Sequence, residues 1–106
     1  GMLLDAAQGL VQRHIPETTI AEAERAIVLG VKRDIELGWT QVQDAGGSYA
    51  EVALFRKLYR DGKIKLRIYK ALSAPGREAQ QLFSEGPTIG EHGHRLTVRT
   101  VKLYVD

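Results

Sequence analysis

The chain of 106 residues contains no cysteine, which excludes disulfides, thiolate zinc fingers, iron–sulfur clusters and thiol catalysis. It has only three prolines, and no apolar run approaches the roughly 20 residues of a membrane-spanning helix, so no membrane contact is expected. The excess of positive over negative charge is also small, because 15 Lys and Arg nearly balance 13 Asp and Glu. What is present, 43% hydrophobic and 26% charged residues, is typical of one folded domain, which we expect in the cytoplasm because no signal peptide follows Met2.

Apolar periodicity predicts that residues 2–38 form a helical N-terminal part. In residues 2–14 the apolar positions recur at i, i+3, i+4 and i+7, which is typical of an amphipathic helix, and Pro16 ends it. A second helix is predicted to follow Thr19, because Thr19 and Glu22 have the spacing of a capping box. Gly38 is suited to end this helix in a left-handed conformation.

The remainder, residues 39–106, alternates strand patterns with helix patterns. Strands are predicted over 39–44, over the alternating segment that begins at Ile64, and over 96–105. A capping box at Ser48 and Glu51 starts the helix between the first two strands, and a short helix ending near Phe83 precedes a glycine-rich loop over 84–94. Such alternation predicts an α/β fold with about three parallel strands, preceded by two helices.

Each predicted strand has one apolar face and one polar face. Val42, Ile68 and Val101 belong to the apolar side, whereas Gln43 and Lys102 belong to the polar side. Sheets covered on both faces have nearly continuous apolar strands, so this pattern favours strands that line a barrel interior near an active site. The alternation of the last strand slips between positions 98 and 101, which predicts a bulge or bend.

Three polar motifs have simpler interpretations than a functional site. His92 and His94 could share a metal, but they lie in the glycine-rich loop, and an exposed loop explains them. The segment 44–48 could cradle a phosphate, but a tight turn capped by Ser48 explains it. The segment 63–70, with four cations and Tyr69, supports an alternative function as a small α/β module that binds RNA. The low net charge argues against this alternative, so a nucleic-acid partner is not favoured.

Lys102 is the most informative single residue. It lies within an apolar run, 101–105, and burying its ammonium group would cost free energy. We therefore expect Lys102 to be paired, to lie at an edge, or to take part in chemistry.

Five stretches occur here in the same order as in one enzyme family. They are LVQRHIP at 10–16, WTQVQDAG at 39–46, the helix at 52–63, LRIYKALS at 66–73 and VKLYVD at 101–106. On these stretches the chain resembles an internal segment of amidohydrolase family 3, metal-dependent hydrolases similar to N-substituted formamide deformylase. The resemblance implies a partial (β/α) barrel whose parent enzyme hydrolyses the C–N bond of a small amide-type substrate by metal-bound hydroxide.

The resemblance also implies roles for individual residues. Lys102 matches the position of a lysine that is carboxylated and bridges divalent, zinc-like metal ions, while Gln43 and Asp44 are candidates for the substrate side. Many family members have histidine where this chain has Gln43. The family's own H-x-H pair precedes this segment, so His92 and His94 receive no role.

The family's other metal ligands fall outside the chain, which stops directly after a predicted strand. We therefore expect residues 1–106 to be a single fragment domain, inactive alone and without a stably bound metal. The open edges of a partial sheet also predict a homo-oligomer.

Overall fold

In the computed structural model, which describes residues 2–105, the chain folds as a mixed α/β structure. Its elements are a 3₁₀-helix (Asp5–Gln8), α1 (Gly9–Gln12), α2 (Ile20–Glu36), β1 (Gln41–Ala45), α3 (Tyr49–Arg60), β2 (Arg67–Ser73), α4 (Arg77–Glu85), β3 (Thr88–Gly90), α5 (Glu91–His94) and β4 (Leu96–Lys102). No helix in the described part of the chain is both long and apolar enough to cross a membrane. Both predicted capping boxes are formed, at Thr19 with Glu22 and at Ser48 with Glu51.

The strands form one open sheet in the order β1-β2-β4-β3. β1, β2 and β4 are parallel, as the alternation of strands and helices predicted. β3 is an additional strand, antiparallel to β4, within the segment for which a loop is predicted. With only three residues, β3 is too short to show a periodic pattern in the sequence.

The predicted irregularity of the last strand is a β-bulge. Lys70 pairs with Val98 and the next residue, Ala71, pairs with Thr100, so Arg99 is the extra residue. The strand ends at Lys102, earlier than predicted, and Leu103 and the two residues after it are exposed. Asp106, the predicted end of that stretch, lies outside the described residues.

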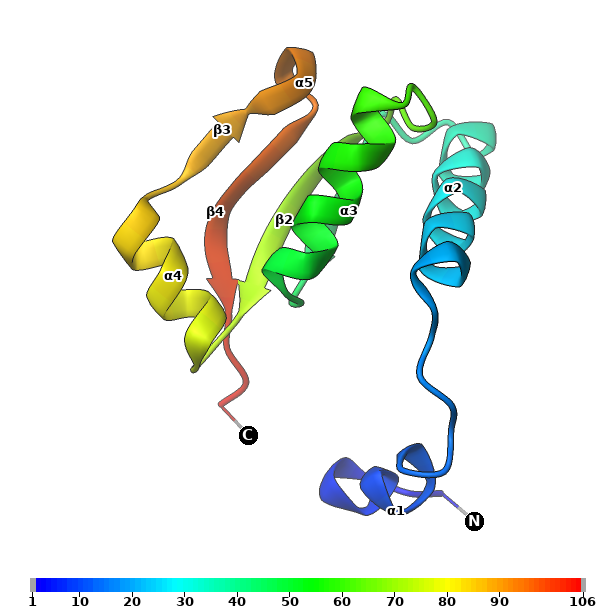
Figure 1. Cartoon of the computed structure of the whole chain (residues 1–106), viewed down its shortest axis with the longest axis vertical. Helices are drawn as coiled ribbons and strands as arrows, with labels where there is room; N and C mark the ends of the chain where they lie inside the picture. Colours follow the sequence, from blue (N-terminus) through cyan, green and yellow to red (C-terminus); the bar gives the residue numbers. More distant parts are fainter. Residues whose placement is uncertain (1, 106) are drawn as a thin grey trace.

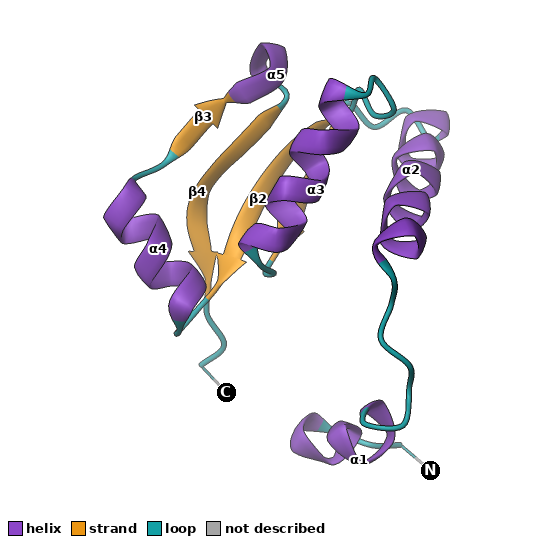
Figure 2. Ribbon diagram, viewed as in Figure 1, coloured by secondary structure: helices purple, strands orange, loops and turns teal. Residues whose placement is uncertain are grey.

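α3 and α4 lie on one face of the sheet (Figure 2), whereas strand residues of the other face, among them Gln43 and Arg67, are exposed. Leu58 of α3 and Leu82 of α4 belong to the same core as Leu72 of β2, so both helices pack on one side. The core residues are Val31, Val52, Phe55, Leu58, Tyr59, Ile64, Leu66, Ile68, Leu72, Leu82, Leu96 and Val98. The predicted apolar strand faces are therefore the faces that meet the helices.

The N-terminal segment is less regular than predicted. Residues 2–14 contain only the 3₁₀-helix and the single turn of α1, which lie apart from the sheet at the end of an extended connection (Figure 1). Leu3, Leu10 and Val11 are exposed, so the apolar stripe that predicted a longer helix has no partner. Isolated helices of this length are marginal in water without such a partner.

Candidate functional site

The ends of the three parallel strands meet along one edge of the sheet, here called the carboxyl edge. Asp44 is the penultimate residue of β1 and the loop to α3 follows it, Ser73 ends β2, and Lys102 ends β4. Because β1, β2 and β4 run in the same direction, residues distant in sequence are gathered at this edge. In parallel α/β folds this is the edge at which ligands bind.

Gln43 and Lys102 both belong to the open face, but they are not neighbours. Gln43 pairs with Tyr69, whereas Lys102 pairs with Ser73, four residues further along β2. The two positions are therefore about 13 Å apart along the strands and, because β2 lies between β1 and β4, about 10 Å apart across them. The row between them consists of Ala45, Ala71 and Thr100, whose small side chains leave the surface low.

Lys102 lies at the end of its strand and is half-buried, so it is not enclosed in an apolar interior. Its Nζ lies 4.9 Å from the centre of the Tyr104 ring, a cation–π contact. Its carbonyl oxygen accepts a hydrogen bond from the backbone N–H of Ala74 at 2.9 Å, which fixes the strand end beside β2. Lys102 therefore lies at the end of an inner strand, with its ammonium group beside an aromatic ring.

Lys70 is the buried lysine of this edge, although its sequence placed it in an exposed basic strand. Only 1% of its side chain is exposed, and its Nζ lies 2.6 Å from Asp44 Oδ2, 2.6 Å from Glu51 Oε2 and 2.6 Å from the carbonyl oxygen of Gly46. The alternation that starts at Ile64 contained the signal, because it continues to position 70 on the apolar face. Lys70 therefore does not belong to a nucleic-acid surface.

The loop between β1 and α3 is tied to β2 by Gly47 as well as by Lys70. The N–H of Gly47 donates to Ser73 Oγ at 2.7 Å, and its carbonyl accepts from the N–H of Ser73 at 2.9 Å. Gly47 has φ +125°, and a Cβ there would collide with the Glu51 carboxylate and the Lys70 ammonium group. This geometry agrees with the interpretation of the loop as a turn. The missing side chain of Gly47 leaves space for the ion pairs of Lys70 with Asp44 and Glu51.

The two substrate-side candidates point in different directions. Gln43 is exposed on the open face, whereas Asp44 faces the helices and is engaged by Lys70. Gln43 is thus available to donate or accept hydrogen bonds with a ligand on the open face. Asp44 is instead part of the ion cluster that holds the loop.

His92 and His94 lie at the opposite edge of the sheet, immediately before β4 begins. The His92 ring stacks on Tyr59, with 5.4 Å between ring centres. Tyr59 donates its hydroxyl proton to the carbonyl of Leu66, and burial raises the pKa of Tyr59 to about 12. Neither histidine approaches Lys102.

Residues 2–105 bring together no group of three His, Asp or Glu side chains that could hold a metal ion. At the carboxyl edge, the carboxylates of Asp44 and Glu51 are both engaged by Lys70. A divalent metal does not fit these residues alone. Any metal centre would need ligands from outside this segment.

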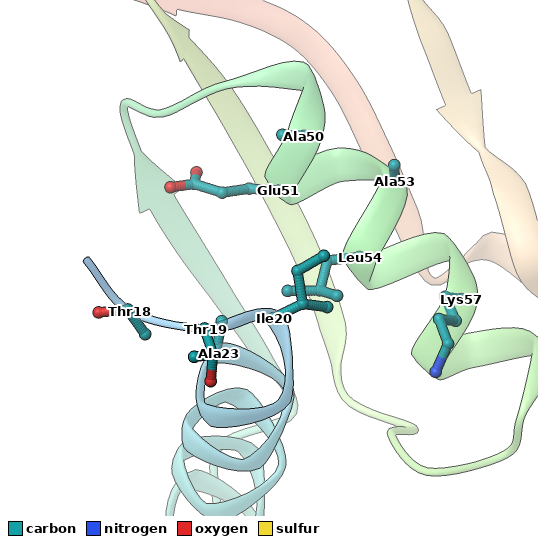
Figure 3. A pocket seen from close by; sticks show the side chains of 9 residues that line it. All are labelled: Thr18, Thr19, Ile20, Ala23, Ala50, Glu51, Ala53, Leu54 and Lys57. Atoms are coloured by element: carbon teal, nitrogen blue, oxygen red, sulfur yellow. The ribbon is translucent and has the colours of Figure 1, made fainter. Parts of the chain in front are cut away.

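An apolar groove lies on the helix side, between the start of α2 and α3 (Figure 3). Its volume is about 380 Å³, and its lining residues are Thr18, Thr19, Ile20, Ala23, Ala50, Glu51, Ala53, Leu54 and Lys57. It holds no histidine, and its acidic member, Glu51, is the partner of Lys70. The groove therefore offers apolar surface rather than a catalytic pair.

Comparison of the chain with protein-family models, with curated proteins and with solved structures gives no match.

Proposed function

We propose that this chain is one wall of a metal-dependent amidohydrolase barrel that hydrolyses amide-type C–N bonds of a small molecule. The observation that carries the proposal is the division of the sheet between its two faces. Helices pack on one face, while the open face presents Gln43 and, at the ends of the parallel strands, Lys102. We place the whole protein in the cytoplasm, which fractionation of cells that produce it would check.

The chemistry of the open face supports a barrel interior over a free surface. In a (β/α) barrel the inward side chains of the strands fill the interior, and those at the carboxyl ends surround the substrate. Here the surface between Gln43 and Lys102 is formed by the small side chains of Ala45, Ala71 and Thr100. A small substrate over this row would have the Gln43 amide at one end and the Lys102 amine at the other.

Lys102 is the proposed contribution of this segment to the metal centre. The ammonium group first loses a proton, and the neutral amine then forms an N–C bond to CO₂ and releases a second proton, which leaves an anionic carbamate on the side chain. The half-exposed position at a strand end leaves Nζ accessible for this reaction. Because one ligand does not hold a catalytic metal, the chain alone is proposed to be inactive.

The test of this assignment is Lys102→Ala in the whole protein that contains this segment. We expect amide hydrolysis and bound metal to fall together, and added short-chain carboxylic acids to restore part of both by replacing the lost carboxylate. Lys63→Ala, which removes an exposed lysine before β2, is the matched control and should change neither. Unchanged hydrolysis and metal content in Lys102→Ala would refute the role of Lys102.

A separate measurement tests whether the chain is only part of a metal site. Elemental analysis of the purified 106 residues, after equilibration with zinc and removal of excess, should find well under one zinc per chain. One tightly held zinc per chain would contradict the proposal.

We further propose that the isolated chain forms a homo-oligomer. β1 has a neighbour on one side only, so its other edge presents unpaired backbone groups to a second copy. The exposed apolar side chains of Leu10, Val11 and Ile15 add surface that association would remove from water. Light scattering at high concentration should give a mass above 11.8 kDa, and a monomer at that mass would contradict this.

A further inference from the structure

The edge of the sheet opposite Lys102 carries a recess of about 370 Å³. Its lining residues are Thr40, Lys65, Arg67, Gly93, His94 and Arg95. We propose that this recess binds a phosphoryl group, either inorganic phosphate or the phosphate of a small phosphomonoester. The site is distinct from the proposed hydrolase chemistry, because it lies at the other ends of the same strands.

Like charges lie side by side in this recess. Ile68 pairs with Leu96, and its N–H donates to the carbonyl of Arg95 at 2.7 Å. The residues that precede this pair, Arg67 and Arg95, are therefore neighbours on adjacent strands. Lys65 lies two residues before Arg67 and therefore on the same face. Like charges opposed across strands destabilise a sheet unless an anion lies between them.

No carboxylate neutralises these cations within the recess. None of its lining residues is Asp or Glu. Among residues 2–105, the ion pairs present involve neither Lys65, Arg67 nor Arg95. Three cations that share one concave surface without a counter-charge raise the local positive potential, which favours a bound anion.

The backbone around the recess is also unusual. His92, Gly93 and His94 have φ values of 54°, 69° and 63°, a left-handed conformation that histidine seldom adopts. This turn brings Gly93 and His94 into the lining, and Arg95 Nη1 donates to the carbonyl of His92 at 3.1 Å. Backbone held in such conformations is concentrated at ligand-binding sites.

The donor set suits a tetrahedral oxyanion. Two guanidinium groups each offer paired N–H donors that match phosphate oxygens, and Lys65 adds a point charge. Thr40 adds a neutral hydroxyl donor. A linear polyanion would need a basic track that continues beyond the recess, but Lys70, the next lysine of the basic segment, is buried. This favours a small phosphate over a nucleic acid.

The test is calorimetric titration of the whole chain, at low ionic strength, with inorganic phosphate, glycerol 2-phosphate and a uridine dodecamer in turn. Arg67→Gln with Arg95→Gln should weaken binding of the phosphate or the ester about tenfold or more, because both paired donors are lost. The control is a variant of equal net charge, Arg25→Gln with Arg60→Gln, which removes two exposed arginines elsewhere and should change affinity less than about twofold.

The two small probes distinguish the source of the phosphoryl group, since tighter binding of one identifies it. A stability measurement distinguishes loss of binding from misfolding. Without phosphate, the double Gln variant should unfold at about the same urea concentration, because removal of the repulsion between like charges offsets the lost hydrogen bond from Arg95 to the carbonyl of His92. Absence of binding by both small probes, equal loss in the control variant, or binding of the dodecamer alone would overturn the proposal.

Discussion

The buried ion cluster formed by Lys70, Asp44 and Glu51 predicts that stability depends on which charge is removed, the cation or its two carboxylate partners. The Lys70 side chain is 1% exposed, whereas the side chains of Asp44 and Glu51 are 41% and 49% exposed. If Lys70 is replaced by methionine, both carboxylates reach water and an apolar group takes the place of the ammonium nitrogen, which lies 5.8 Å from the centre of the Phe55 ring. If both carboxylates are replaced by their amides, the ammonium group stays buried without a counter-charge.

These two changes should therefore cost different amounts of stability. Lys70→Met loses hydrogen bonds to charged groups that are partly replaced by water, and we expect a loss of about 1–2 kcal/mol in the free energy of unfolding. Asp44→Asn with Glu51→Gln leaves an uncompensated buried charge, and we expect a loss of about 3–5 kcal/mol. For a domain of about 5–15 kcal/mol, the second loss is a large fraction of the total.

Urea unfolding followed by far-ultraviolet circular dichroism measures both losses. The triple variant, which combines Lys70→Met with both amide substitutions, should recover about 2 kcal/mol relative to the double variant, because the stranded charge is gone. The reasoning is refuted if Lys70→Met costs as much as the double amide variant, or if the costs simply add in the triple variant.

Two further predictions concern the stability of the fold. Gly47→Ala should lower the free energy of unfolding in urea by about 2–3 kcal/mol, because its Cβ would collide with the Glu51 carboxylate and the backbone has φ +125°. Gly62→Ala, at φ +68° with open space around it, should lower it by only about 1 kcal/mol, and equal losses in the two variants would count against the collision. Burial raises the pKa of Tyr59 from 10.0 to about 12, so between these pH values the unfolded chain loses a proton that the folded chain keeps, and stability falls as pH rises. Tyr59→Phe should remove about 1–2 kcal/mol of that fall while Tyr104→Phe, at an exposed site, should not; an unchanged pH dependence in Tyr59→Phe would contradict this.

The sequence predicted those features that repeat over several residues or have a fixed spacing. The parallel strands β1 and β2 alternate for five residues or more, β4 alternates up to its bulge, and each capping box depends on two residues three apart. The bulge at Arg99 was predicted because a pattern of period two shows where it slips. These features are local, so they can be predicted without knowing what each strand contacts.

Other features depended on contacts between distant segments. β3 exists because its three residues find β4, and α1 is short because no surface covers its apolar side. At the candidate site, the exposure of Gln43 followed from its strand face. The alternation of its strand indicated the face on which Lys70 lies, but the three acceptors that make its burial possible are 19 to 26 residues away and are not visible in that alternation.

The extra residue in β4 determines which chemistry the strand presents. Arg99 and Thr100 occupy the place of one residue opposite β2, so every later side chain is turned by half a period. If β4 kept all its residues but ran on without the bulge, Val101 would face outward and Lys102 would lie against the helices. Deletion of Arg99 itself would leave a regular strand in which Val101 still faces the helices and Lys102 still faces outward. The bulge thus accommodates one additional residue and keeps the Lys102 amine on the open face.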